Sequence, residues 1–544
     1  MAHVARGAIS SASLVKDRVA LLALGGFALI VAPPVLWLLV AAARAGLTEP
    51  GARWTEPHAL ALLGRSLVLA LGTTAGAILL GLPAGIVVAR TRVAGRRALR
   101  SAALVALATP PAASAIGWSL LLAPGARPLP LPSPGGGALR SWEGFPEALL
   151  VLTGLLWPVI ALVVARAVEW LPREPEEAAR LETTPWRAFA AAAGPTLRAV
   201  LGAAALAVFL LALAEYAVPG TLGVAVYPVE ILSRFQAARD EGEVAALALP
   251  LLALVLPLLA LQERWLAAAP PLEGDPQEAP PLPLDRARRA LLAVLGCVPL
   301  LATGLPLLAL LRESLPPRTY VAVLADAAAP LQVSGVASGA AVAVAVPQAF
   351  LLALVCEGPA ARMPARAARW IGRLAVLPYA LPGSLIGVAW IALLNRPGPL
   401  GDLYASLLVL PLCYASQFFP FAYFPLAAAV RRVDPSLVEA ARLDGASSWQ
   451  IAGAVVAPLL RGPLLVAAAL VGLLSLRELD ATSLLRPPDG DTLGFRIHDL
   501  FHYGPSRQVA ALAVIAAAGA AGIAAAAGAV LERLGRNERP PGER

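Results

Sequence analysis

Long apolar stretches constrain the fold of this 544-residue chain more than any other feature of its sequence. A membrane-spanning helix needs about 20 mainly apolar residues, and roughly twelve stretches of that length follow one another along the chain. Hydrophobic residues make up 58% of the sequence and charged residues 14%, whereas a soluble surface of this size needs about 25% charged residues. We therefore predict an all-α polytopic membrane protein.

The predicted spans form two sets of six, separated by a linker. The first set lies at 19–43, 66–89, 100–123, 146–170, 198–220 and 245–266. The second set lies at 289–311, 330–355, 370–394, 403–429, 462–485 and 508–531. Residues 267–288 are rich in proline and acidic side chains, which is typical of an extended, solvated linker. We expect one repeat over 1–266 and another over 289–544.

Two matching segments support an internal duplication. Ser114-Ala115-Ile116-Gly117 in the third span resembles Ser384-Leu385-Ile386-Gly387 in the ninth. An even number of spans in each half makes the repeats parallel, so equivalent loops face the same side of the membrane. The first apolar run lacks a small-residue cleavage site, so we expect it to be a retained span.

A second pair of similar segments follows the fourth and the tenth predicted spans. Residues 177–197 read EAARLETTPWRAFAAAAGPTL and residues 439–460 read EAARLDGASSWQIAGAVVAPLL. In both copies a tryptophan precedes a proline by nine positions, at Trp186 and Pro195 and at Trp449 and Pro458. Each copy is polar at its start and apolar at its end, which predicts two helices joined by a corner at the mouth of a span.

The corners of the two copies differ. In the second copy, Asp434 can cap a helix that begins at Pro435, and Gly445 can adopt the positive φ of a sharp corner. The first copy is one residue shorter and has no glycine there. We expect Thr184 to cap a helix that begins at Pro185 instead.

Arginine placement predicts which side of the membrane these loops face. Cytoplasmic loops carry an excess of basic residues. Arginine is concentrated in the loops that hold the two copies, in the loop between the second and third spans, in its counterpart between the eighth and ninth spans, and at the end of the linker. These segments contain Arg90, Arg92, Arg96, Arg97, Arg100, Arg173, Arg180, Arg187, Arg286, Arg288, Arg289, Arg362, Arg366, Arg369, Arg373, Arg431, Arg432 and Arg442. Both copies, the linker and both termini are therefore expected in the cytoplasm.

The two copies resemble the EAA loop of the membrane subunits of bacterial ABC importers. In that family the loop forms a coupling helix that docks on the ATPase subunit. The resemblance also implies a multi-pass protein of the bacterial inner membrane. The resemblance implies a type I, MetI-like importer permease, with Glu177, Ala178 and Ala179 as coupling residues in the first copy and Glu439, Ala440, Ala441 and Gly445 in the second. The alternative is a plain amphipathic loop whose glutamates complement a helix N-terminus.

Residues 474–501 carry a more specific resemblance, to the fused permeases of iron(III), thiamine and related importers. The family pattern K-E-L-x-x-T-x-L-L-R-P, then T-L-x-x-R, is matched by Arg477, Glu478, Leu479, Thr482, Leu485, Arg486, Pro487, Thr492, Leu493 and Arg496. Asp480 stands where that pattern usually has proline, and 214–232 resembles the matching region of the first half. The resemblance implies iron(III) as substrate, with thiamine, phosphonate and polyamine as alternatives. It also implies an ATPase dimer and a periplasmic substrate-binding protein as partners, and no nucleic acid; segments 220–243 and 486–507 would face that binding protein.

Charged residues inside spans are costly, so they are expected to face the bundle interior or water. Glu215, Arg477, Glu478 and Asp480 meet this description and are candidates for the translocation path. The alternative is an ion network between Arg477 and the two acids that only fixes helix packing. Carboxylate oxygens also suit a hard cation such as Fe(III).

His498 and His502 are four residues apart, which places both on one face of a helix, as a metal pair requires. No third ligand follows at a useful spacing, so we expect no metal site in this chain. The cysteines, Cys297, Cys356 and Cys413, are isolated in or beside apolar runs and are expected to act as small hydrophobic residues.

The chain is not expected to be an enzyme. Lys16 is its one lysine and follows no glycine-rich loop, so a phosphate-binding loop of the Walker A type cannot form here. ATP and Mg²⁺ would bind in a partner subunit, and this chain would carry no cofactor. Two alternatives remain open, a secondary transporter driven by an ion gradient and a polytopic membrane enzyme.

Overall fold

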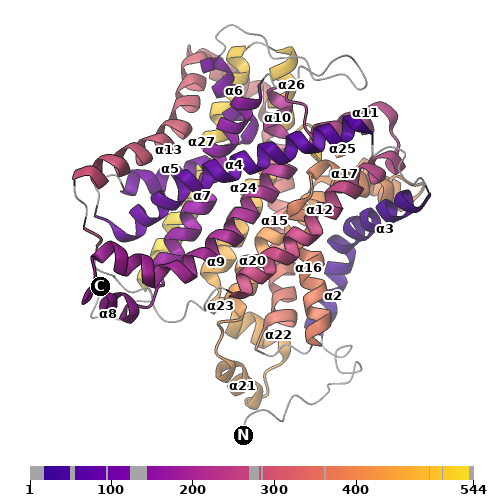
Figure 1. The fold of residues 1–544 in the computed structure, drawn as a ribbon. Helices are drawn as coiled ribbons and strands as arrows, with labels where there is room; N and C mark the ends of the chain where they lie inside the picture. Colours follow the sequence, from indigo (N-terminus) through magenta and orange to yellow (C-terminus); the bar gives the residue numbers. More distant parts are fainter. Residues whose placement is uncertain are drawn as a thin grey trace. The chain divides into compact units, whose positions relative to one another are not determined.

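The computed structural model describes residues 18–48, 56–92, 96–122, 144–268, 281–283, 286–359, 363–488, 490–504 and 506–537. Within these ranges the regular elements are helices (Figure 1). Most of the linker, the loop 123–143 and both termini lie outside the described ranges. The predicted side of the termini therefore stays a prediction.

The helices before the linker are α2 (Arg18–Ile30), α3 (Ala32–Thr48), α4 (Pro57–Arg90), α5 (Arg96–Ala108), α6 (Pro111–Leu122), α7 (Phe145–Glu169), α8 (Glu174–Arg180), α9 (Pro185–Ala214), α10 (Ala217–Thr221), α11 (Tyr227–Ala238) and α12 (Glu241–Ala268). The helices after it up to the second loop copy are α13 (Arg286–Glu313), α14 (Arg318–Asp326), α15 (Ala328–Glu357), α16 (Ala365–Val376), η1 (Leu377–Ala380), α17 (Gly383–Leu394), α18 (Pro399–Ala405), α19 (Val409–Gln417) and α20 (Phe419–Val430). The last helices are α21 (Pro435–Leu443), α22 (Ser448–Gln450), the π-helix η2 (Ile451–Val456), α23 (Ala457–Leu459), α24 (Arg461–Leu476), α25 (Thr482–Leu485), α26 (Leu493–Tyr503) and α27 (Ser506–Asn537).

The predicted all-α polytopic fold is confirmed. Among the described residues, 7 helices are long and apolar enough to cross a membrane, and the number reaches 12 if each of five bent helix pairs is one span. Every stretch predicted from the sequence overlaps one of these straight or bent spans. The bends themselves are a finding that composition did not predict.

The strongest bends lie at prolines. The third span bends by 107° between Ala98–Ala108 and Pro111–Leu122, and the ninth by 113° between Ala365–Ala380 and Gly383–Leu394. A proline disfavours helical geometry at the residue before it, and Leu381, which precedes Pro382, is extended with ψ 141. The two matching Ser-x-Ile-Gly segments lie in the helices that follow these bends, so the repeat extends to the break in the span.

The described residues divide into two compact units that do not follow the order of the sequence. Of the described residues, those within 1–44, 329–493 and 522–544 form one unit, and those within 45–328 and 494–521 form the other. Thus the first span belongs mainly to the unit that contains the second loop copy, and α13 belongs to the unit that contains the first. The proposed repeat boundaries near 266 and 289 stay a prediction.

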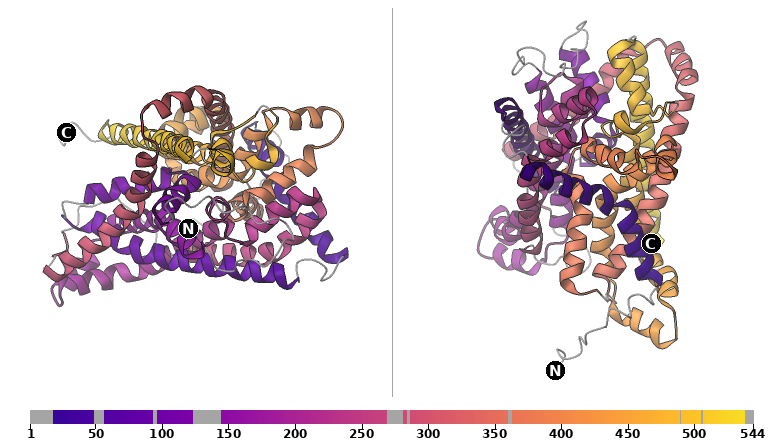
Figure 2. Two further views of the ribbon diagram at one scale, coloured as in Figure 1. Left: turned by 90° about the horizontal axis from the view of Figure 1, so that it is seen from above. Right: turned by 90° about the vertical axis from the view of Figure 1, so that its right-hand side faces the viewer.

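In the unit of 45–328, α4 and α7 lie side by side over most of their length (Figures 1 and 2). Small residues allow this contact, because a side chain at Gly81 or Gly85 would meet the backbone oxygen of Trp157 or Ala161 at 2.6 Å. Close approach through small residues is typical of helix pairs in membranes. The fully buried Trp157 belongs to an apolar cluster that extends to Phe189 near the start of α9.

In the unit of 329–493, aromatic side chains dominate the core around α19 and α20. Phe419 stacks on Tyr423 with ring centroids 6.0 Å apart and also contacts Phe27 of α2 at 6.2 Å. The hydroxyl of Tyr414 hydrogen-bonds the hydroxyl of Thr482 at 2.6 Å. This contact fixes the short helix α25, whose neighbouring residues carry the buried acids described below.

Candidate functional site

The second loop copy forms the predicted corner. Asp434 caps α21, because its carboxylate accepts a hydrogen bond from the Ser436 N–H at 2.9 Å. This bond lowers the pKa of Asp434 below its usual value. Gly445 has φ 80, and a Cβ added there would have no atom within 4 Å, so the corner requires glycine for its backbone angle and not for space.

A hinge-like segment follows this corner. Ser447 and Gln450 form a capping box, and the chain then passes through the π-helix η2. The helices Ser448–Leu459 and Arg461–Leu476 meet at 84°. Single turns of π-helix inside α-helices often mark functional positions, and this one lies between the corner of the second loop copy and the span that follows.

The predicted coupling residues of this copy face outward. Glu439 and Ala440 are exposed. The one buried residue of α21 is Val438. Leu443 is 89% exposed and Trp449 is 55% exposed. The loop therefore exposes a large aliphatic and an aromatic side chain, which suits contact with another protein.

The first copy exposes equivalent residues, but the helices that carry them are arranged differently. Glu177 is exposed, and Leu181 is as exposed as Leu443. Thr184 is the residue before α9, as predicted, but its side chain makes no capping hydrogen bond. From Pro185 the helix continues into its span without the strong bend seen in the second copy.

A buried ion pair under the first copy was not predicted. Arg90, at the end of α4, donates to both carboxylate oxygens of Glu176 at 2.9 and 2.7 Å. The side chains are 2% and 7% exposed, and Arg180 adds a contact to Glu176 at 2.8 Å. Burial alone would raise the pKa of Glu176, but the hydrogen bonds and charges of Arg90 and Arg180 outweigh it and lower the pKa.

The sequence contained one signal for this pair. Glu176 precedes the first E-A-A, and the equivalent residue of the second copy is Val438. Both are buried. A charged residue at a position that the other repeat fills with a buried valine indicates a buried counter-charge.

The acids predicted for the translocation path each accept hydrogen bonds at a helix start. Glu215 accepts from the N–H groups of Ala217 and Val218 at 2.9 and 3.4 Å. Glu478, its equivalent in the second half, accepts from the Ala481 N–H at 2.7 Å. Carboxylates are favourable at helix N-termini, so both residues have a structural role in the break that follows their span.

Asp480 makes a longer-range connection. Its Oδ2 accepts the Ser384 N–H at 2.7 Å, at the start of α17, which directly follows the 113° bend. Gln417 donates to Glu478 at 3.2 Å, and Arg477 is half-buried at the end of α24. These contacts bring Glu478 and Asp480 together beside the bend of the ninth span; whether Glu215, Arg477, Glu478 and Asp480 line a path stays a prediction.

The histidine pair lies as its spacing predicted. The rings of His498 and His502 are 4.6 Å apart in an edge-to-face arrangement on α26. Burial, and then the charge of His502, lowers the pKa of His498 to about 4. Within the described ranges no group of three or more His, Cys, Asp or Glu side chains could hold a metal ion.

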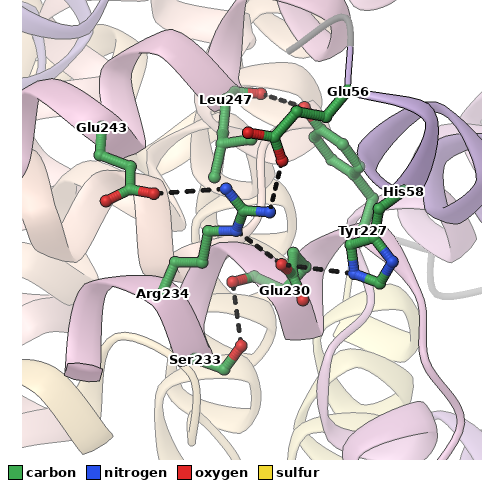
Figure 3. A network of polar contacts seen from close by, with 8 residues as sticks. All are labelled: Glu56, His58, Tyr227, Glu230, Ser233, Arg234, Glu243 and Leu247. Atoms are coloured by element: carbon green, nitrogen blue, oxygen red, sulfur yellow. Dashed lines mark hydrogen bonds and ion pairs between the residues drawn. The ribbon is translucent and has the colours of Figure 1, made fainter. Parts of the chain in front are cut away.

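A polar network connects α11 with the starts of α4 and α12 (Figure 3). Arg234 of α11 contacts Glu230 at 2.6 Å, Glu56 at 3.1 Å and Glu243 at 3.3 Å. His58 lies 3.6 Å from Glu230. Burial lowers the pKa of Arg234, but the hydrogen bonds to Glu230 and Glu56 outweigh it and keep the guanidinium charged. Arg234 thereby joins the helix starts of α4 and α12 to α11, inside the segment 220–243 predicted to face a binding protein.

Taken together, broken apolar spans and an exposed helix–corner–helix loop define a polytopic permease subunit. Residues 349–537 match the family described as binding-protein-dependent transport system inner membrane component.

Individual permease proteins are also similar to this chain. The chain is 23% identical over 476 residues to the Fe(3+)-transport system permease protein FbpB 2 of Haemophilus influenzae, which covers 85% of this chain and 88% of the relative. It is 28% identical over 171 residues to the 2-aminoethylphosphonate transport system permease protein PhnV of Salmonella typhimurium, over 31% of this chain and 64% of the relative. It is also 32% identical over 98 residues to the osmoprotective compounds uptake permease protein GgtC of Synechocystis, over 18% of this chain and 35% of the relative.

Proposed function

We propose that this chain is the membrane subunit of an ABC importer and that its substrate is iron(III). A separate ATPase pair would bind the two EAA loops, and a periplasmic binding protein would deliver the substrate. The observation that carries the substrate assignment is the similarity to an Fe(3+) permease over 85% of the chain and 88% of that relative. A relative of this length indicates that both halves are shared, and not only the coupling region.

The coupling role is supported by the exposed second loop and the hinge behind it. Closure of an ATPase dimer would displace α21, and the π-helix and 84° bend would let the loop rotate against α24. A two-state element of this kind converts partner binding into alternate openings. Glu439, Ala440, Ala441 and Gly445 would form the main contact, with Glu177, Ala178 and Ala179 as the equivalent in the first copy.

A phosphonate is the second candidate substrate, because a phosphonate permease matches 31% of the chain. The test is uptake into cells that contain the chain, its ATPase and its binding protein, with labelled ferric iron and labelled 2-aminoethylphosphonate supplied in parallel. Uptake of iron alone would support the first assignment. Uptake of the phosphonate alone would keep the class of transporter and replace the substrate.

Coupling can be tested at Gly445 with a matched control. Gly445 and Gly398 both have positive φ, at 80 and 93, and a Cβ added at either would have no atom within 4 Å. Alanine at Gly445 therefore introduces a backbone strain of about 1–2 kcal/mol. Gly398 has ψ −157, in a region that only glycine populates readily, so alanine there introduces at least as much backbone strain and is a stringent control. We expect Gly445→Ala to reduce uptake while Gly398→Ala retains it, and Gly445→Pro to abolish uptake with normal membrane insertion, because proline cannot adopt that φ. Normal uptake by the proline variant would refute the coupling role.

A further inference from the structure

Part of the linker is bound to the first loop copy. The Leu282 N–H donates to the backbone oxygen of Arg90 at 2.9 Å, and the backbone oxygen of Pro283 accepts from Trp186 Nε1 at 2.9 Å. Leu282 is 3% exposed and belongs to the apolar cluster that includes Phe189 and Trp157. The segment thus joins the end of α4 to the start of α9.

The composition of this segment suits a bound conformation. Prolines on both sides of Leu282 restrict φ and have no N–H group. Restricting the free chain in this way lowers the conformational entropy that is lost when the segment docks. The one amide of residues 281–283 is then the one that bonds Arg90.

Arg90 is the common point of attachment. Its side chain holds Glu176 of α8 and lies 5.0 Å from the centre of the Phe189 ring of α9, while its backbone oxygen holds Leu282. Four parts of the chain therefore meet at one residue. In the second copy, the buried position of α21 holds Val438, and Trp449 is 55% exposed where Trp186 is half-buried.

We propose that residues 281–283 act as a clamp that fixes the first EAA loop, 174–186, to the end of α4. The first loop then moves as one rigid body with α4 and α9, whereas the second loop moves on the hinge formed by η2 and the bend after it. The linker is in this respect an intramolecular binding partner and not only a tether between repeats. The consequence for transport, that the two loops couple unequally, rests on the proposed function; the clamp does not.

Hydrogen–deuterium exchange on the full chain in lipid nanodiscs tests the clamp without any transport measurement. We expect the Leu282 amide, and the amides of 176–186, to exchange at least about tenfold more slowly than the amides of 439–449. Trp186→Phe removes the Nε1 donor and retains a ring, and Leu282→Ala removes the buried side chain. Each should accelerate exchange in 176–186 about tenfold.

Trp449→Phe is the matched control, because it makes the same change at the equivalent position of the second copy. It should leave exchange in 176–186 unaltered. The clamp is refuted if the Leu282 amide exchanges at the rate of an unprotected amide, or if Trp186→Phe leaves the first loop unchanged. Should Leu282→Ala not fold, the unmodified chain and Trp186→Phe still give either result.

A second measurement relates the clamp to coupling. In proteoliposomes with the ATPase and binding protein, Trp186→Phe should reduce the substrate moved per ATP hydrolysed by several-fold. An unchanged ratio with accelerated exchange would overturn unequal coupling but keep the clamp. Failure of the unmodified chain to transport either substrate would refute the proposed function, while the exchange result would stand.

Discussion

Replacing Glu176 by valine would remove the carboxylate that neutralises Arg90 in a place where the arginine side chain is only 2% exposed. Breaking a buried ion pair by removing one partner costs about 3–5 kcal/mol, because the remaining charge stays desolvated. Arg180, the other partner of Glu176, adds little to this cost, since it is 23% exposed and can turn toward water. We therefore expect Glu176→Val to be one of the most destabilising single changes in this unit.

A double variant that replaces both partners of the ion pair separates the effect of the charge from that of packing. Leu354 lies seven residues after Pro347, as Arg90 lies seven residues after Pro83. Arg90→Leu together with Glu176→Val therefore gives the first half the residue types of the second. Replacing both partners of a buried pair by apolar side chains is often neutral or stabilising, so we expect the double variant to be close to the unmodified chain.

Thermal unfolding in detergent, followed by circular dichroism, measures both variants. The single variant should lower Tm by on the order of 5 °C or more, and the double variant should recover most of that loss. If the single variant melts with the unmodified chain, the pair is not desolvated as described. If the double variant is as unstable as the single one, the loss comes from packing and not from the unpaired charge.

Acidification gives an independent check on the same pair. The pKa of Glu176 is lower in the folded chain than its usual 4.5. Its stabilisation is therefore complete above pH 4.5 and is lost as the pH falls below that value toward the folded pKa. The difference in Tm between the unmodified chain and the double variant should accordingly be constant from pH 7 to pH 5 and change only in stronger acid.

Three further predictions concern the other polar sites. If Asp480 serves mainly to accept the Ser384 N–H, Asp480→Asn should retain Tm and uptake, because asparagine caps helices as well as aspartate. Asp480→Ala should lose about 1 kcal/mol of stability. Loss of uptake by the Asn variant at normal Tm would instead indicate a charge in the translocation path. Arg234→Met should lower Tm more at pH 7 than at pH 5, because three carboxylates remain together, and an equal loss at both values would contradict that electrostatic origin. The pKa of His498 is about 4 and that of an unfolded histidine about 6.5. The chain should therefore lose about 2 kcal/mol of stability as the pH falls from 7 to 5. His498→Phe should reduce this dependence of stability on pH, and an identical pH profile would exclude His498 as its source.

Much of the fold could be predicted because it depends on local patterns. Apolar run length placed the spans, and the residue types of the second corner predicted the cap at Asp434 and the positive φ of Gly445. The bends were less visible, because a proline marks a possible break without giving its angle. Pro83 and Pro158 lie inside α4 and α7, which are not broken, while Pro382 follows a 113° bend.

The contacts that hold the first loop are long-range, and a local pattern does not determine them. Arg90 and Glu176 are 86 positions apart, and Trp186 and Pro283 are 97 apart. The linker was expected to be extended and solvated over its length, and a three-residue docking segment within it has no periodicity of its own. Its affinity for the loop comes from contacts that form only when α4 and α9 are in place.

The internal duplication nevertheless provides a comparison that a single sequence usually lacks. Where the halves place unlike residues at equivalent positions, the difference identifies a site that one half has and the other lacks. Glu176 opposite Val438 locates the buried ion pair and, through Arg90, the clamp. Asp480 has Ala217 as its equivalent, since each follows its span-end glutamate by two positions, and Asp480 is the residue that reaches Ser384 across the bend. The two halves therefore share a scaffold, while their differences assign a fixed loop to the first half and a hinged loop to the second.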